Sequence, residues 1–299
     1  MSGLGDGEGM GVEVEEGAEL VRRAAAGILA VKPAYAEVIG FYGDIFVAQE
    51  EIRPRVRIEP FRLSPEMARI KRRDHFPLIQ TEEMRFDPEA GLSLFEEVCR
   101  IAVDRRTELS APAQTLRKRS ADASALFQGF LAEDENRIQQ AAADFGVEAA
   151  ALSFFLYHSL RPSLCRCEHD LAGFVVNEPS WEKGYCPVCG SQPALAQLDA
   201  EGRRFLFCSF CWHRWPAPRT ACPFCGNGDP GRLAYLYSDE EQEHRLDLCD
   251  ACRKYVKTID ARNLARPFYP PLEQVATLHL DLKAAESGYE SLLPGHRPV

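Results

Sequence analysis

The chain has 299 residues and a formal net charge of −10 at pH 7. This length predicts about two domains and is ample for a hydrophobic core that does not depend on bound metal. The acidic charge argues against a general nucleic-acid binder. The longest apolar runs fall short of the roughly 18 residues of a membrane-spanning helix. Because the acidic, glycine-rich start is also unlike a signal peptide, we expect a cytoplasmic protein without membrane insertion.

The first half of the chain is predicted to be helical. Residues 1–17 have the composition of a disordered tail. Helical patterns follow over residues 18–31 and from Pro33 onward, since proline suits a first helical position. Asp87, followed by a proline and a glutamate, has the form of a capped helix start. We therefore expect a helical domain over residues 18–180.

Two further helical patterns complete this domain. They cover residues 112–133 and 135–160, and Gly146 permits a break within the second. Cys99 lies on the apolar face of the helix that starts after Asp87. We interpret it as a small buried hydrophobic side chain rather than a metal ligand.

Residues 52–73 form a basic block in the acidic chain. Its cations are Arg53, Arg55, Arg57, Arg62, Arg69, Lys71, Arg72 and Arg73. Prolines at positions 54, 60 and 65 predict that much of the block is extended. We interpret the block as a solvated connector, and the alternative is a docking surface for an acidic partner.

Four CxxC pairs dominate the second half of the chain. They are Cys186 and Cys189, Cys208 and Cys211, Cys222 and Cys225, and Cys249 and Cys252. The first and third pairs stand in the sequence CPxCG, and each is followed by a strand-like run, a polar turn and a second strand-like run. One supersecondary unit therefore occurs twice.

A tetrahedral metal site explains this spacing. It needs four thiolates about 2.3 Å from one ion, and two residues between paired cysteines let a tight turn aim both sulfurs at one point. The hairpin carries the second pair of each unit back to the first. We predict two metal sites, with Cys186, Cys189, Cys208 and Cys211 as ligands in one and Cys222, Cys225, Cys249 and Cys252 in the other.

Two other interpretations of the cysteines compete with metal binding. Disulfides are rare in reducing compartments, and the sequence shows no export signal. Thioredoxin-like redox exchange requires a CxxC that opens a helix after a strand, whereas these pairs are flanked by strand-like runs.

Three nearby residues fit the metal pattern less well. One residue separates Cys165 from Cys167, with His169 close by, and this spacing does not suit a ribbon knuckle. We interpret the segment as a linker, with a third metal site as the alternative. His213 follows a complete set of ligands, so we expect it to support the site from outside or to lie at the surface.

The predicted fold class is α+β. An all-α domain precedes two tandem zinc-ribbon or rubredoxin-like modules over residues 181–217 and 218–265, and a C-terminal helix and tail occupy residues 266–299. Residues 255–260 are expected to form a further strand of the second ribbon. Phe210, Trp212 and Trp215 are expected to pack the ribbons together, because small ribbons bury little apolar surface alone.

The order of these motifs resembles the FdhE-type formate dehydrogenase accessory proteins. The similarity rests on CPVCGSQP, CSFCWHRW, CPFCGN and CDACRKYVKTID, followed by LEQVATLHLDLKAAESGY. It is specific from Tyr185 to Tyr289 and compatible with the helical half. Cys165, Cys167 and the basic block have no counterpart in the family pattern.

The resemblance implies a cytoplasmic accessory factor rather than an enzyme. Such a maturation chaperone would bind the catalytic subunit of respiratory formate dehydrogenase before its export. The family is similar to rubredoxins in its metal knuckles, which favours iron in each four-cysteine site, with zinc as the alternative. The resemblance implicates the same eight cysteines in metal binding and function.

Other functions are open at this stage. Cysteine spacing alone does not separate the accessory protein from a rubredoxin-type electron-transfer protein. A nucleic-acid-binding ribbon is less favoured, although arginines at positions 203, 204, 214 and 219 lie near the knuckles. We predict no catalytic residue, because the sequence lacks GxSxG, P-loop, GxGxxG and HExxH patterns. His279 and Asp281 are two residues apart and would not share a helix face.

Overall fold

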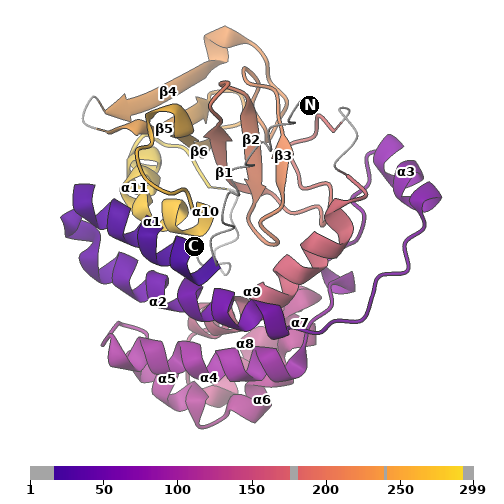
Figure 1. Cartoon of the computed structure of the whole chain (residues 1–299), viewed down its shortest axis with the longest axis vertical. Coiled ribbons are helices and arrows are strands. Elements are labelled where there is room, and N and C mark those ends of the chain that lie inside the picture. The colour runs from indigo at the N-terminus through magenta and orange to yellow at the C-terminus, as the bar shows by residue number, and fades with distance from the viewer. Residues whose placement is uncertain (1–16, 176–180, 239–240, 292–299) are drawn as a thin grey trace, which may run out of the picture.

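The computed structural model describes residues 17–175, 181–238 and 241–291. Helices fill the first range, and one sheet with two further helices fills most of the others (Figure 1). The predicted fold class, α+β with a helical region before two four-cysteine modules, is confirmed. The expected disordered tail falls outside the described residues except for residue 17, which begins the first helix.

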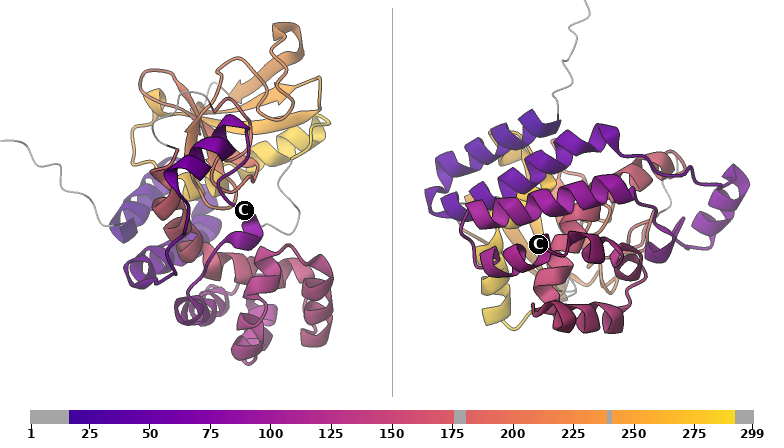
Figure 2. Two further views of the ribbon diagram at one scale, coloured as in Figure 1. Left: turned by 90° about the vertical axis from the view of Figure 1, so that its right-hand side faces the viewer. Right: turned by 90° about the horizontal axis from the view of Figure 1, so that it is seen from below.

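The helical region contains nine α-helices among the described residues. They are α1 (Gly17–Val31), α2 (Ala36–Ile52), α3 (Pro65–Arg73), α4 (Pro88–Asp104), α5 (Ser110–Arg117), α6 (Ser120–Ser124), α7 (Phe127–Leu131), α8 (Glu135–Phe145) and α9 (Ala149–Ala172). Seen from below, α2 lies between α1 and α4 (Figure 2), and it contacts both. These helices and α9 form the body on which the sheet rests.

Local signals set several helix ends. Asp87 caps α4 as predicted, since its Oδ1 accepts the backbone N–H groups of Glu89 and Ala90 at 3.1 Å each. Gly146 ends α8 with φ of 69°, which is the expected break. The helix expected over residues 112–133 is instead divided into α5, α6 and α7. Between α5 and α6, Arg119 leaves the helical backbone with φ of −124° and ψ of 28°.

The helix α9 continues through Pro162 to residue 172, so the interpretation of residues 165–169 as a linker is wrong. Proline has no N–H to donate to the carbonyl of His158, one turn earlier. Gln49 of α2 donates to that carbonyl from Nε2 at 2.8 Å instead. A tertiary contact therefore satisfies the group that the proline frees.

The basic block is less extended than its prolines suggested. Residues 56–64 have no regular structure, but α3 covers the second half of the block. Ser64 caps this helix by accepting the backbone N–H of Met67 at 3.1 Å. The helix protrudes from the body of the molecule in Figures 1 and 2. Its role as connector or docking surface stays a prediction.

Both ribbons contribute to a single sheet of six strands. These are β1 (Pro193–Leu198), β2 (Arg204–Cys208), β3 (Arg214–Pro216), β4 (Leu233–Ser238), β5 (Glu241–Cys249) and β6 (Lys254–Asp260), and β6 contains the strand predicted over residues 255–260. Their order is β3-β2-β1-β6-β5-β4. Each ribbon is antiparallel, and the two join edge to edge where β1 pairs with β6 in parallel, placing Ala196 opposite Thr258.

The C-terminal helix expected near the end of the chain is two short helices, α10 (Pro270–Ala276) and α11 (Leu278–Glu286). Thr277 separates them with a non-helical backbone, φ −121° and ψ 23°. Gly288 follows α11 with φ of 78°, which agrees with its expected role at the helix end. Both helices lie between the sheet and α1 (Figure 1).

The main hydrophobic core extends from the helices into the first ribbon. It includes Phe46 of α2, Phe95 of α4, Phe155 of α9 and Trp215 of β3. A small second cluster joins β5 and β6 to α11, and its members are Leu246, Leu248, Tyr255 and Ala284. Within the described ranges, we find no helix that combines the length and apolar character needed to cross a bilayer.

Candidate metal centres

The first four-cysteine cluster lies where two turns of the first ribbon meet. Its sulfur atoms are separated by 3.5 Å between Cys189 and Cys208, 3.6 Å between Cys189 and Cys211, and 3.7 Å between Cys186 and Cys211. Four sulfurs in a tetrahedron around an ion at roughly 2.3 Å would be about 3.8 Å apart. The arrangement thus fits a tetrahedral metal ion.

The second cluster repeats this geometry in the second ribbon. The sulfurs of Cys222 and Cys252 are 3.7 Å apart, as are those of Cys225 and Cys249. In each cluster all four sulfurs lie within 4.8 Å of one another. The structure brings the eight predicted ligands together in the two predicted groups, and both groups could bind a metal ion.

The first turn of each ribbon has the same backbone hydrogen bonds. The N–H of Gly190 donates to the carbonyl of Cys186 at 2.9 Å, and that of Gly226 donates to Cys222 at 3.0 Å. Both glycines have positive φ, 78° and 72°. This conformation favours glycine, which explains the CPxCG pattern.

The second turn of each ribbon ends in the same conformation without glycine. Trp212 follows Cys211 with φ of 60°, and Arg253 follows Cys252 with φ of 57°. A left-handed backbone at such residues costs roughly 1–2 kcal/mol. The side chains are held by other contacts, since Trp212 Nε1 donates to the hydroxyl of Tyr157 at 3.0 Å.

The thiols of the first cluster are buried, so their thiolate forms need a nearby cation to be stable. Burial raises the pKa of Cys186 and Cys211. Burial also acts to raise the pKa of Cys189, but hydrogen bonds from Cys186, Cys208 and the other neighbours outweigh it and lower the pKa. A metal ion stabilises thiolates in such a site because the thiolate is the ligand form.

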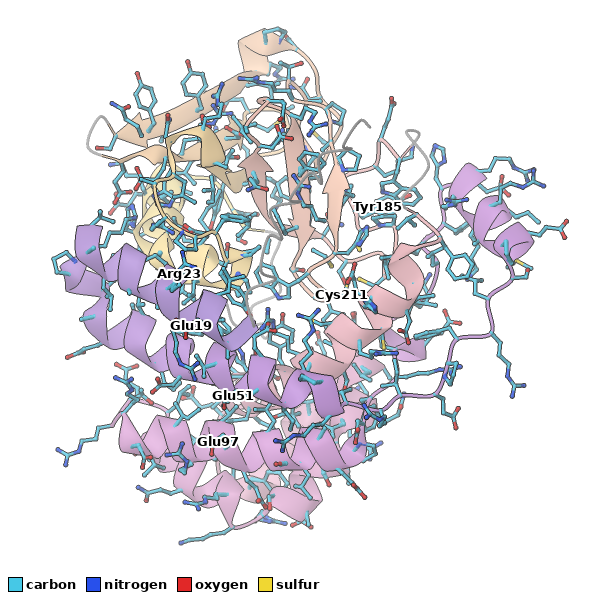
Figure 3. All side chains as sticks on the ribbon, viewed as in Figure 1. Glu19, Arg23, Glu51, Glu97, Tyr185 and Cys211 are labelled. Carbon is cyan, nitrogen blue, oxygen red and sulfur yellow. The ribbon has the colours of Figure 1, made fainter. Side chains whose placement is uncertain are left out.

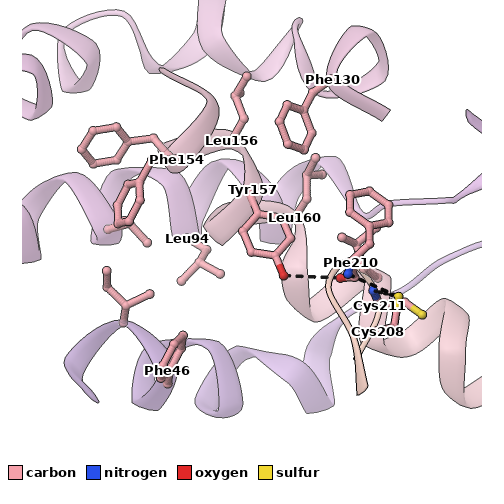
Figure 4. Packing of buried hydrophobic residues seen from close by; sticks show 14 of the residues in the cluster. Phe46, Leu94, Phe130, Phe154, Leu156, Tyr157, Leu160, Cys208, Phe210 and Cys211 are labelled. Atoms are coloured by element: carbon pink, nitrogen blue, oxygen red, sulfur yellow. Dashed lines mark hydrogen bonds between the residues drawn. The ribbon is translucent and has the colours of Figure 1, made fainter. Parts of the chain in front are cut away.

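Helical-region residues cover the first cluster. The N–H groups of Leu78 and Ile79 donate to the carbonyls of Pro187 and Val188 at 2.9 and 3.0 Å, inside the first CxxC turn. Figure 4 shows Tyr157 of α9 beside the second turn, where its hydroxyl donates to the carbonyl of Ser209 at 3.2 Å. All four cysteines are buried as a result.

The contacts between the helical region and the first ribbon extend to both sides of this cluster. Figure 3 shows Cys211 close to α9 and Tyr185 on the side that faces α3. The hydroxyl of Tyr185 donates to the carbonyl of His75, just beyond α3, at 2.7 Å. The first ribbon is therefore bound to the helical region by hydrogen bonds as well as by apolar packing.

The second cluster is closer to solvent. Cys225 is exposed and Cys252 is half-buried, whereas Cys222 and Cys249 are buried. Asn227 Nδ2 lies 3.9 Å from the sulfur of Cys249. The two centres share a local geometry but differ in their access to solvent.

Three cysteines lie outside the two clusters. Cys99 is buried as predicted, and burial raises the pKa of its thiol to about 12. Cys167 is buried in α9 and donates from Sγ to the carbonyl of Arg85 at 3.1 Å. Cys165 lies on the same helix. Among the described residues, neither Cys165 nor Cys167 belongs to a group of three potential ligands, so these residues do not form the alternative third site.

His213 supports the first cluster from outside it. Its ring Nδ1 lies 2.8 Å from Glu168 Oε1 of α9, and its backbone carbonyl accepts the N–H of Cys208 at 3.0 Å. The side chain is buried and stacks on Trp215. This is the supporting position expected for it, rather than that of a ligand.

A buried charged network was missed by the sequence reasoning. Lys32 Nζ lies 2.9 Å from Glu241 Oε1, and His244 Nε2 lies 3.2 Å from Glu273 Oε2. Arg266 Nη2 donates to the same Glu273 oxygen at 2.9 Å. The network joins the end of α1 to β5 and α10. Strand alternation was the available signal, because His244 shares its face with the apolar residues at 246 and 248.

His279 and Asp281 have different partners, which agrees with the expectation that they do not share a face. His279 lies between the hydroxyl of Tyr35 at 2.7 Å and Glu241 Oε2 at 3.0 Å. Asp281 Oδ2 accepts from Lys257 Nζ at 2.7 Å. Both residues take part in contacts between structural elements.

Comparison with known proteins finds relatives that share this segment and this fold. Residues 185–219, which contain the whole first cluster, match the model of the FdhE central domain. A protein FdhE homolog of Aquifex aeolicus is 39% identical over 149 residues. The chain is therefore similar to FdhE proteins. Protein FdhE of Escherichia coli strain K12 / DH10B is 29% identical over 206 residues.

These FdhE relatives are matched over part of their length. The alignments cover 48% of the chain and 51% of the Aquifex protein, and 63% of the chain and 60% of the Escherichia protein. The crystal structure of the FdhE protein from Pseudomonas aeruginosa covers 94% of the chain and 96% of that protein, with a TM-score of 0.64 and 22% identity. At that identity the likeness shows a common fold.

Proposed function

We propose that the chain is a cytoplasmic accessory protein for respiratory formate dehydrogenase. It acts as a maturation chaperone that binds the catalytic subunit before export. The observation that carries the proposal is the position of the FdhE central-domain match, which spans the first four-cysteine centre. The segment that resembles the family most specifically is therefore also the segment that forms the buried centre.

Each cluster is proposed to hold one metal ion. Thiolates in a tetrahedron accept iron and zinc, and the similarity to rubredoxins favours iron, with zinc as the alternative. Protein ligands fill all four positions, so the centres offer no open position for a substrate. Bound metal would supply structure, electron transfer or a partner contact, and the proposal assigns no catalytic residue.

Complementation of a deletion strain tests the proposal. The strain receives the wild-type chain or Cys208→Ser, and formate oxidation is measured alongside a pull-down of the formate dehydrogenase catalytic subunit. We expect the deletion and Cys208→Ser to abolish formate oxidation, because Cys208 is buried in the first cluster. Cys99→Ala is the matched control, since Cys99 is buried but lies outside both clusters.

Two outcomes would contradict the chaperone function. Normal formate oxidation in the deletion strain, with no catalytic subunit in the pull-down, would refute it. An equal loss of activity in Cys99→Ala and Cys208→Ser would show that general instability, rather than the metal centre, explains the phenotype. In either case the metal centres would need another role.

A rubredoxin-type electron-transfer function is the second candidate. The exposure of Cys225 favours it, because an accessible ligand brings a redox centre close to the protein surface. Metal analysis and a visible spectrum of protein purified without added metal separate the metals, since ferric tetrathiolates are coloured and zinc tetrathiolates are not. A zinc-only protein that still supports formate oxidation would exclude electron transfer.

Nucleic-acid binding has less support than either candidate. Of the arginines near the knuckles, Arg204 is buried and Arg203 pairs with Asp199 at 2.7 Å. Arg214 lies over the ring of Phe205 at 3.4 Å from its centre. Arg203 and Arg214 are therefore engaged within the ribbon, and buried Arg204 does not face a nucleic-acid backbone at the surface. A salt-dependent gel shift with generic DNA and RNA is expected to show no binding.

A further inference from the structure

A cavity of about 490 Å³ lies beside the second cysteine cluster. Its walls come from β2, β4, β5, the start of β6 and the segment before the third CxxC pair. Four cations line it, namely Arg204, Arg219, Arg245 and Lys254. Asp247 is the one carboxylate among the described lining residues. The cavity is therefore cationic in a chain whose net charge is −10.

One of these cations has unused hydrogen-bonding capacity. Arg204 is 4% exposed, and its Nη1 donates to the carbonyl of Ala221 at 2.9 Å. Its Nε and Nη2 have no hydrogen-bond partner. A buried donor without a partner costs about 1–3 kcal/mol, and more when the group is charged. A ligand with an anionic oxygen in the cavity would compensate the charge of this guanidinium group.

The carboxylate in the cavity is already occupied. Asp247 Oδ1 accepts from Arg245 Nε at 2.8 Å, and its Oδ2 accepts from the hydroxyl of Thr258 at 2.8 Å. Oδ2 also lies 3.2 Å from Arg204 Nη2 as an ion pair, without the geometry of a hydrogen bond. Lys254 pairs with Glu290 Oε2 at 2.7 Å, outside the cavity lining. The one lining carboxylate thus faces three arginines, and the excess of positive charge lies on these arginines.

The thiolates beside the cavity balance part of this charge, because Cys222 lies close enough to act on Arg204. The first cluster has the same four thiolates and is covered by the backbone of residues 78 and 79 and by Tyr157. An arginine-lined cavity is not a requirement of a four-cysteine centre. The cations beside the second cluster therefore need a further explanation.

The surroundings of the cavity indicate what occupies it. Leu233 and Tyr235 of β4 line its wall, and β4 is the terminal strand of the sheet within the described residues. Tyr235 and Tyr237 are 61% and 60% exposed, and Leu236 is 38% exposed. An edge strand with exposed apolar side chains can pair with an added extended chain. A free small anion would leave this apolar surface uncovered.

We propose that the cavity binds a carboxylate side chain from an extended segment of a partner protein, and that this segment lies along β4. The guanidinium groups hold the carboxylate, and the tyrosines cover the apolar side chains that flank it. Charge complementarity attracts an acidic segment to this site although the whole chain is acidic. The inference stands apart from the proposed function, because it does not depend on formate dehydrogenase.

Fluorescence anisotropy with a defined probe tests the site. The probe is a fluorescein-labelled peptide of alternating glutamate and valine, which favours an extended conformation, and matched peptides carry glutamine or lysine in place of glutamate. We expect the full-length, metal-loaded protein to bind the glutamate peptide alone. Loss of two charge-assisted contacts in the double variant Arg219→Gln and Arg245→Gln should weaken binding about tenfold or more.

Two further variants separate the contacts from changes in folding. Tyr237→Ser should weaken the glutamate peptide about threefold, because it removes an exposed apolar contact. Arg73→Gln in α3 removes one positive charge far from the cavity and should leave the affinity within about twofold. Thermal midpoints and metal content of all variants check that each protein is folded.

Several results would overturn the proposal. They are equal affinity for the glutamate and glutamine peptides, equal weakening by Arg73→Gln, and no binding of the glutamate peptide up to millimolar protein. Displacement of the peptide by glutarate at matched concentration would show a site for a small anion instead. These measurements contain no formate dehydrogenase, so their failure and a failure of the proposed function are distinguishable.

Discussion

The two cysteine clusters have the same local form and different surroundings. The first is buried in the core shared with the helices, and residues 78 and 79 of the helical region bond to its first turn. The second lies at the surface with Cys225 exposed and an arginine-lined cavity beside it. The difference teaches that one CxxC unit can form either a centre within the core or an accessible one, depending on what packs over it.

The two ribbons are also attached to the helices in different ways. Apolar side chains such as Phe210 and Trp215 join the first ribbon to the main core. The second ribbon contacts the helices through the small cluster at α11 and through the buried charges of Lys32 and His244. The first attachment contains one such pair, His213 with Glu168 of α9, and the second contains several buried charges. We therefore expect the second attachment to depend more strongly on pH than the first.

Loss of a ligand should have the largest effect, and the effect should differ between clusters. Cys189→Ser is expected to lower the free energy of unfolding by about 4 kcal/mol or more, because a metal ligand and part of the shared core are lost together. Cys225→Ser should cost less and should affect mainly β4 to β6. Urea unfolding followed by circular dichroism measures the loss, and hydrogen exchange of α9 shows its extent. Equal effects on α9 would contradict the comparison.

Removal of the buried histidine should have the next largest effect. Burial acts to lower the pKa of His244, but hydrogen bonds to Glu241 and Glu273 outweigh it and raise the pKa. Because the folded-state pKa exceeds the unfolded value of about 6.5, this contribution to stability is complete below that pH and is lost as pH rises through the folded-state pKa. His244→Gln should therefore cost about 3 kcal/mol at pH 6 and less at pH 8.

Glu241 belongs to the same network, but its contribution to stability depends on pH in the opposite direction. Hydrogen bonds from His244 and His279 hold the pKa of Glu241 well below its usual range. Its contribution to stability is present above the unfolded pKa of about 4.3 and is lost as pH falls through the lower folded-state value. Unfolding by urea at pH 4, 6 and 8 measures both effects. His169→Gln, at an exposed position in α9, is the control. A pH dependence unchanged by His244→Gln would refute the ionic attachment.

A methyl group at Gly184 should disrupt the contact between the ribbons. A Cβ there would lie 1.4 Å from the carbonyl oxygen of Pro223, in the first turn of the second cluster. Since a backbone atom is the obstacle, Gly184→Ala should cost about 2 kcal/mol through overpacking. The control is Gly173→Ala, where a Cβ would meet no heavy atom within 4 Å. Equal thermal midpoints for the two variants would contradict this packing.

Replacing the glycines of the two CPxCG turns, Gly190 and Gly226, by alanine should give the smallest difference in stability between the two clusters. Both positions have positive φ, so Gly190→Ala and Gly226→Ala should each cost about 1 kcal/mol. Gly190→Ala should cost slightly more, because its Cβ would lie 3.2 Å from Cγ of Pro77, whereas Gly226 has no heavy atom within 4 Å. Thermal unfolding of both variants measures the difference. A larger loss for Gly226→Ala would contradict the expected effect of the contact with Pro77.

Local patterns allowed the clusters to be grouped before the fold was known. The CxxC spacing, the proline and the glycine of each knuckle act within a few residues, so the two sets of four cysteines could be assigned from their order along the chain. The Asp87 cap and the break at Gly146 are likewise local, and both were predicted. The continuation of α9 past Pro162 was not predicted. The carbonyl of His158, which the proline frees, is bound by Gln49, and Gln49 is 109 residues away.

The sequence by itself determined where thiolates converge, since turn geometry and hairpin return are properties of short segments. Only the tertiary structure decided that β1 and β6 join the ribbons into one sheet and that the first cluster is buried while the second is not. It also placed Lys32 against Glu241 and His244 across more than half of the chain. Such contacts depend on which surfaces exclude water together, and that is a property of the whole packed chain.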